Sequence, residues 1–245
     1  MLRITLVPDP DNAGVGKRPR LGFFILEEMM FIVTQMSSAI SGLISSPVSL
    51  VVLLVLFFCL VLAARFSKIR FTPRLIAHMA LAVAMAVILD MIVLFRMPQG
   101  GSVTPGSMIP LILLSLAYGP AVGLLGGFIF GILNLFLGAY ILHPLQVLLD
   151  YPLPFMFIGL AGAFPKHVNL GVIFTFILRL IPHVISGVVF FHMYTPEGMN
   201  ALWYSLTYNG SFLLAELAMT LVLLNMLPVS RMVQSVNPSV PDISR

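Results

Sequence analysis

The sequence predicts an all-α integral membrane protein, a bundle of transmembrane helices. Of the 245 residues, 59% are hydrophobic and only 9% are charged, and the mean hydropathy is +1.05. A water-soluble domain carries about a quarter charged residues, so this chain has too few to cover a surface that faces water. Lipid requires every backbone polar group to be paired internally, which leaves helix bundles and closed barrels. Continuous apolar runs such as residues 48–64 favour helices over the alternating segments of a barrel.

The leading part of the chain adds one or two hydrophobic segments to the bundle. Residues 1–47 begin with a polar stretch, and within them residues 23–44 form either an interfacial helix or a poor transmembrane span, because glutamates and serines interrupt the apolar run. Residues 48–64 are uncharged and are expected to form an extra transmembrane helix. The single cysteine, Cys59, excludes an intramolecular disulfide. Residues 65–74 are the densest basic loop, and the positive-inside rule places it in the cytoplasm.

A membrane domain of six spans is expected at residues 72–228, followed by a cytoplasmic tail at 229–245. Counted forward from the basic loop, the spans lie at about 75–95, 107–117, 121–137, 145–164, 170–191 and 201–227. This count puts the connections 97–106, 138–144 and 193–200 outside the cell. It puts Lys166 and Arg231 inside, in agreement with the charge rule. The chain is therefore expected to be a multi-pass protein of the cell membrane.

Several polar residues are expected to share the outer half of the bundle. Polar and ionisable side chains within spans are energetically expensive and mark functional sites. The residues in question are Asp150, Tyr151, His183, Tyr204 and Asn209, with Tyr140, His143 and Gln146 on or beside the loop before the fourth span. A carboxylate with aromatic neighbours suits a cationic heteroaromatic solute, because aromatic faces attract cations. We expect a solute-binding pocket that faces outside.

Other interpretations of these residues stay open at this point. A tyrosine near the end of a span is often an interface anchor. His183 follows Pro182 and could satisfy backbone groups at a kink, and Asn209 could bond between helices. Asp90 and Glu216 are further acids within spans. Asp90 could be a structural partner for a polar neighbour, and Glu216 could form the floor of the pocket or relay a proton.

Motifs of enzymes are missing from the sequence. It contains no GxxxxGK[ST] phosphate loop, no HExxH, no CxxC pair and no GxSxG elbow. The glycines between residues 123 and 131 lie inside a span and suit close helix packing. We therefore expect no catalytic residues, no cofactor and no metal, and any ATP that drives transport must be hydrolysed by another protein.

Four stretches carry a resemblance to a known family. They read FRMPQGGSVTPGSMIPLILLSLAYGP, LGAYILHPLQVLLDYPL, FIGLAGAF and YSLTYNGS. They closely resemble the thiamine-specific substrate-binding (S) component of energy-coupling factor (ECF) transporters, over residues 72–228. The resemblance implies a six-helix S-component-like bundle that captures thiamine with high affinity from outside. It also implies a separate transmembrane coupling protein and two cytoplasmic ATPases as partners.

The resemblance also implies which residues bind the substrate. Asp150 matches the family's acid, shortened by one methylene, and Phe130 and Phe191 match two of its tryptophans. A third tryptophan and a nearby acid fall on Gly101 and Pro105, which cannot replace them. The expected substrate-binding residues are Asp150, Tyr151, His183, Tyr204, Asn209, Phe191, Phe130 and Tyr140.

The family's surface for the coupling protein is a face of small residues on the first helix of the six. It corresponds here to the small-xxx-small pairs made by Ala80, Ala82, Ala84 and Ala86. Ordinary packing inside the bundle would explain the same alanines. Alternative functions are an S-component for another vitamin or a thiamine precursor, a stand-alone proton-coupled carrier that uses Asp90 or Glu216, and a membrane-embedded enzyme or scaffold.

Overall fold

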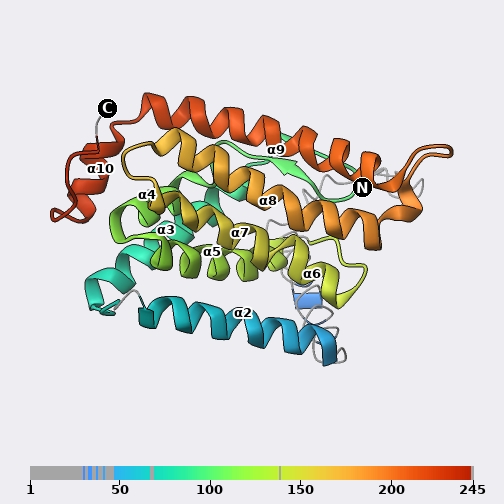
Figure 1. The fold of residues 1–245 in the computed structure, drawn as a ribbon, viewed down its shortest axis with the longest axis horizontal. Helices are drawn as coiled ribbons and strands as arrows, with labels where there is room; N and C mark the ends of the chain where they lie inside the picture. Colours follow the sequence, from blue (N-terminus) through green and yellow to red (C-terminus); the bar gives the residue numbers. More distant parts are fainter. Residues whose placement is uncertain are drawn as a thin grey trace, which may run out of the picture.

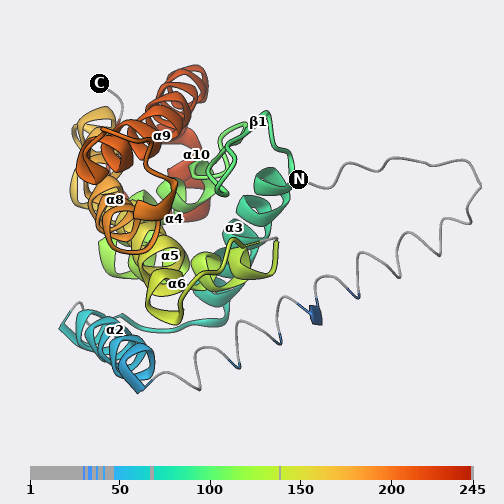
Figure 2. The same cartoon turned by 90° about the vertical axis from the view of Figure 1, so that its right-hand side faces the viewer.

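The computed structural model describes residues 30, 33–34, 37, 41, 47–66, 69–137 and 139–243. They form a helical bundle with one short hairpin (Figures 1 and 2). The helices are α2 (Pro47–Phe66), α3 (Pro73–Met91), α4 (Ile109–Tyr118), α5 (Pro120–Asn134), α6 (Pro144–Asp150), α7 (Pro152–Ile158), α8 (Val168–Phe190), α9 (Ala201–Met226) and α10 (Val229–Val236). Three 3₁₀ turns are η1 (Leu135–Leu137), η2 (Gly159–Ala163) and η3 (His192–Tyr194), and the hairpin pairs β1 (Phe95–Arg96) with β2 (Ser102–Val103).

Five of the six predicted spans are confirmed as helical segments long and apolar enough to cross a membrane. In the part of the chain that the structure describes, these are Pro73–Met91, Pro120–Leu137, Pro144–Ala163, Val168–Phe190 and Ala201–Met226. The remaining predicted span, at 107–117, corresponds to the shorter apolar helix α4, Ile109–Tyr118. Helix α4 has only 10 residues, about 15 Å at the usual rise per residue, because Gly119 at φ 88° and Pro120 reverse the chain.

The fourth span was predicted as one helix and is instead broken in its middle. Helix α6 ends at Asp150 and α7 begins at Pro152. A proline lacks the backbone N–H that would continue the helix, but it suits the first turn of a new one. The break therefore places Asp150 and Tyr151 at a bend inside the bundle rather than on a straight helix.

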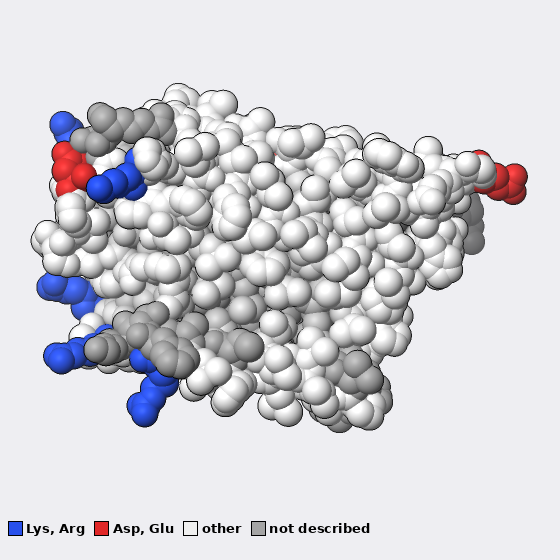
Figure 3. All heavy atoms as spheres, viewed as in Figure 1, with Lys and Arg blue, Asp and Glu red and all other residues white. Residues whose placement is uncertain are grey.

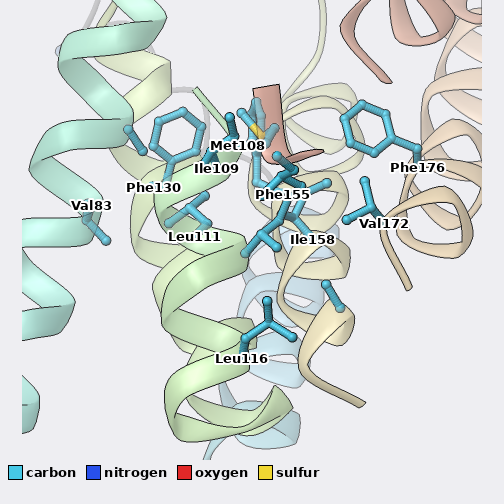
Figure 4. Close-up of a cluster of buried hydrophobic side chains, with 14 of the residues drawn as sticks. Val83, Met108, Ile109, Leu111, Leu116, Phe130, Phe155, Ile158, Val172 and Phe176 are labelled. Atoms are coloured by element: carbon cyan, nitrogen blue, oxygen red, sulfur yellow. The ribbon is translucent and has the colours of Figure 1, made fainter. Parts of the chain in front are cut away.

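Very close backbone contacts hold α5 against the segment that follows this break. A Cβ atom built on Gly127 would lie 2.2 Å from the carbonyl oxygen of Phe155, and one on Gly159 would lie 2.1 Å from backbone atoms of Gly123 and Leu124. The hydroxyl of Ser115 donates to the carbonyl oxygen of Gly159 and bridges α4 to η2. The buried hydrophobic core surrounds these contacts and is drawn in Figure 4.

The predicted extra segment 48–64 corresponds to helix α2, which contacts α5 and α6 at the side of the bundle (Figures 1 and 2). The predicted segment 23–44 lies outside the described residues except for single positions. The predicted tail at 229–245 begins with α10, and this helix packs on α4. Val233 is buried, and the side-chain amide of Asn237 donates to the carbonyl oxygen of Ala117 at 2.7 Å, so the start of the tail belongs to the fold.

Basic side chains are concentrated at one end of the molecule. The end of α2, the start of α3 and α10 lie together at one end in Figure 1, and the lysine and arginine side chains visible in Figure 3 gather at that end. Arg65 lies in the last turn of α2 and Arg74 in the first turn of α3. The opposite end carries the hairpin and the connections around residues 139–143 and 191–200.

We predict that Gly159→Ala lowers the free energy of unfolding by about 1–3 kcal/mol, the usual range for overpacking a core. The added methyl group would collide with backbone atoms of Gly123 and Leu124, which cannot rotate away. Thermal unfolding of the purified protein in detergent measures the effect. Gly210→Ala is the matched control, because its Cβ would meet nothing within 4 Å. Equal unfolding temperatures for the two variants would contradict the prediction.

Candidate solute-binding site

A cavity opens between the hairpin and the helices α6, α7, α8 and α9, near the end of the bundle opposite the basic cluster. Its empty volume is about 800 Å³, open solvent at the mouth included. Seven of the eight residues expected to bind substrate line it, namely Asp150, Tyr151, His183, Phe191, Tyr204, Asn209 and Tyr140. The structure thus brings together residues that are up to 69 positions apart in the sequence.

Asp150 lies at the centre of a hydrogen-bond network on one wall of the cavity. Its Oδ2 accepts from Gln146 Nε2 at 2.6 Å and from Ser186 Oγ at 2.8 Å. Its Oδ1 lies 3.2 Å from Nδ1 of His183. Three such partners hold the carboxyl group in place. The cavity therefore has a carboxyl group fixed in its wall.

His183 and Asn209 connect α8 to α9 beside this carboxylate. The amide of Asn209 donates to the carbonyl oxygens of Ser205 at 2.9 Å and His183 at 3.3 Å. His183 is 8% exposed, and its Nε2 has no hydrogen-bond partner among the residues that the structure describes. An unpaired buried nitrogen on a cavity wall is suited to a hydrogen bond with a bound solute.

The hairpin covers one side of the cavity with its backbone. The N–H groups of Gln99 and Gly101 both point to the hydroxyl of Tyr208, with N···O distances of 3.1 and 3.4 Å. A Cβ atom on Gly101 would lie 2.8 Å from the ring of Phe212. Position 101, where the family resemblance expects a tryptophan, is a glycine in this chain. The ring of Phe212 occupies the space beside it.

The inner part of the cavity has a polar floor. Arg179 Nη1 and Glu216 Oε2 are 2.9 Å apart, with both side chains almost fully buried. The amide of Asn134 donates to Asp90 Oδ2 at 2.6 Å. These four residues line the cavity. Sequence reasoning had left the roles of Asp90 and Glu216 open and had missed Arg179, although a single arginine within an apolar span was a visible signal.

Aromatic side chains frame the mouth. The hydroxyls of Tyr140 and Tyr194 are 2.6 Å apart, and the ring centroids of Tyr140 and Phe191 are 5.8 Å apart. The hydrogen bond with Tyr194, together with burial, raises the pKa of the Tyr140 phenol above its ordinary value of 10.0. The Tyr140 phenol therefore stays neutral at physiological pH and acts as a hydrogen-bonding group.

Three predicted positions differ from expectation. Phe130 does not line the cavity: it is fully buried and packs edge-to-face on Phe155, with ring centroids 4.7 Å apart.

On α3, Ala80 and Ala84 are exposed, but Ala86 is fully buried and Ala82 packs partly against the core. Ala86 is therefore unavailable to a partner, because it faces the interior of the bundle.

Comparison with known proteins places the chain in a family. The model of the thiamine transporter protein family (Thia_YuaJ) matches residues 76–235. The chain is 36% identical to the thiamine transporter ThiT of Bacillus subtilis over 169 residues, which are 61% of this chain and 88% of that protein. It is 34% identical to ThiT of Lacticaseibacillus paracasei over 140 residues, 49% of this chain and 70% of that protein.

A solved structure of ThiT from Listeria monocytogenes has the same fold, with a TM-score of 0.58 and 24% sequence identity. The match covers 65% of this chain and 96% of that chain. Helix α2 precedes the region that the family model matches. The helices α3 to α9, which form the bundle and its cavity, fall almost entirely within the matched residues. The chain belongs to the thiamine transporter protein family.

Proposed function

We propose that this chain captures thiamine at its cavity, which faces outside, and imports it as the substrate-binding subunit of an ATP-driven ECF transporter. Its family consists of transporters rather than enzymes. The observation that carries the proposal is the hydrogen-bonded carboxylate of Asp150 in an aromatic-walled cavity, in a chain of this family.

Thiamine and the cavity are complementary in charge and shape. Thiamine joins a cationic thiazolium ring to an aminopyrimidine ring. The negative charge of Asp150 offsets the cation, and the faces of Tyr204, Tyr208 and Phe191 can attract it further. His183 Nε2, which has no partner among the described residues, can pair with a polar group on either ring.

The balance of charges favours the free vitamin over its phosphate esters. The cavity is lined by the carboxylates of Asp90, Asp150 and Glu216 against the single guanidinium of Arg179. When the acids are ionised and His183 is neutral, the lining carries net negative charge. A phosphate group would add about −1.5 to −2 charge to the ligand. Like charges in a cavity of low dielectric constant repel strongly.

The partners belong to the same proposal. The sequence has no phosphate loop, so ATP hydrolysis falls to two separate cytoplasmic ATPases, joined to this chain by a transmembrane coupling protein. Ala80 and Ala84 are exposed one turn apart on α3. Small side chains at this spacing allow another helix to approach closely. We place the coupling protein on this face.

We predict that titration calorimetry with the purified protein detects submicromolar thiamine binding, and that Asp150→Asn weakens it at least tenfold, about 1.4 kcal/mol. The substitution keeps the shape of the side chain but removes the charge that balances the thiazolium cation. Glu197→Gln makes the same chemical change on an exposed loop and should bind like the parent.

Thiamine monophosphate is expected to bind at least tenfold more weakly than thiamine.

Absence of any thiamine binding would rule out the ligand assignment while leaving the fold intact. If Glu197→Gln weakened thiamine binding as much as Asp150→Asn, the role assigned to the Asp150 carboxylate would be wrong. Equal affinities for thiamine and its monophosphate would overturn only the argument from charge balance.

We further predict that vesicles containing this chain alone do not accumulate thiamine, whether or not a proton gradient is imposed. Accumulation is expected only when the coupling protein, the ATPases and ATP are present, because the sequence contains no phosphate-loop motif. Uptake of radiolabelled thiamine measures the outcome. Accumulation by the chain alone under a proton gradient would instead identify a proton-coupled carrier.

A further inference from the structure

Gln146 uses its whole side-chain amide to join Asp150 to the loop beside the cavity mouth. The side chain is 1% exposed. Its Nε2 donates to Asp150 Oδ2 at 2.6 Å and to the carbonyl oxygen of Tyr140 at 3.0 Å, and its Oε1 accepts from the N–H of Leu142 at 3.0 Å. A flipped amide would face two acceptors with its oxygen, so one orientation satisfies every partner.

A second contact ties the same loop to the residue after Asp150. The N–H of Tyr140 donates to the hydroxyl of Tyr151 at 2.7 Å. Tyr140 in turn lines the cavity. The 139–142 segment is thus fastened at Tyr140 and Leu142 to residues next to Asp150 and one turn before it on α6.

We propose that Gln146 is a positioning residue that links the Asp150 carboxylate to the 139–142 segment, so that a solute held at Asp150 is retained by a closed loop. The inference rests on the proposed binding function. Opening the segment breaks two bonds of the Gln146 amide and frees it to turn, which removes one of the donors that hold Asp150. A ligand that favours the ordered carboxylate must therefore favour the closed segment as well, because such coupling is reciprocal.

Ser186 provides the matched comparison. Its hydroxyl is buried and donates from α8 to the same Oδ2 atom of Asp150 at 2.8 Å, and among the described residues it makes no hydrogen bond to the 139–142 segment. Gln146→Met keeps the length of the side chain and removes all three hydrogen bonds. Ser186→Ala removes one donor to the carboxylate and leaves the segment fastened. Both variants are expected to weaken thiamine binding, but only the first should release the loop.

The test labels a cysteine placed in the segment. In a Cys59→Ser background, Ala139→Cys puts a thiol at a position that is 8% exposed. Its rate of reaction with a maleimide reports opening. We expect saturating thiamine to slow labelling at least tenfold in the parent and in Ser186→Ala, and less than twofold in Gln146→Met. Without ligand, Gln146→Met should label at least tenfold faster than the parent.

The outcomes separate this inference from the proposed function. If thiamine fails to bind the parent, the ligand assignment falls, and the rates without ligand still decide whether Gln146 fastens the segment. Parent-like labelling of Gln146→Met in both states overturns the inference. If Gln146→Met does not fold, Gln146→Leu takes its place, because it also removes all three hydrogen bonds. Parent-like labelling of that variant overturns the inference equally.

Discussion

The carboxylate of Asp150 must be stabilised inside a bundle that offers it little water, and much of the surrounding architecture follows from this requirement. Burying an isolated ion costs several kcal/mol unless hydrogen bonds and opposite charges offset it. Gln146 reaches Asp150 from the same helix, and His183 and Ser186 reach it from α8. These bonds fix the bend after α6 against α8. The shape of the cavity wall therefore depends on one ionised group and its donors.

Helix α8 has a polar face toward the interior of the bundle and an apolar face on its outside. Arg179, His183 and Ser186 are buried and turned to the interior. Phe174, Ile177, Ile181, Ile185 and Val189 form the exposed face of the same helix. Residues three or four apart share one face of a helix, and both sets follow this spacing. The pairing of Arg179 with Glu216 joins α8 to α9 at a second depth, so the two helices are connected by polar contacts both beside the cavity and beneath it.

The sequence predicted the helices well, because hydropathy and length decide which segments suit lipid. It also predicted α4, at 107–117 against the observed Ile109–Tyr118. The start was set two residues too early because residues 106–108 are buried before the helix begins, and apolar composition does not separate a buried loop from a helix. The break after Asp150 was not predicted, although Pro152 is a visible signal for it. Ala80 and Ala82 are 200° apart around a helix, so only one of the alanine pairs can face outward, and composition alone does not say which. Whether Phe130 points to the cavity or to the core likewise depends on how α5 is rotated about its axis, which composition does not show.

The hairpin is held over the cavity through its main chain, since two of its N–H groups share the hydroxyl of Tyr208. Main-chain groups are the same in every residue other than proline, so this attachment places little demand on the identity of the hairpin side chains. The attachment depends instead on the hydroxyl of Tyr208. During evolution, residues of the hairpin other than Gly100, which has φ 98°, and Gly101, which lies against Phe212, could change to suit a different solute while the covering segment kept its place. A change at Tyr208 would instead remove this attachment without altering a single residue of the hairpin.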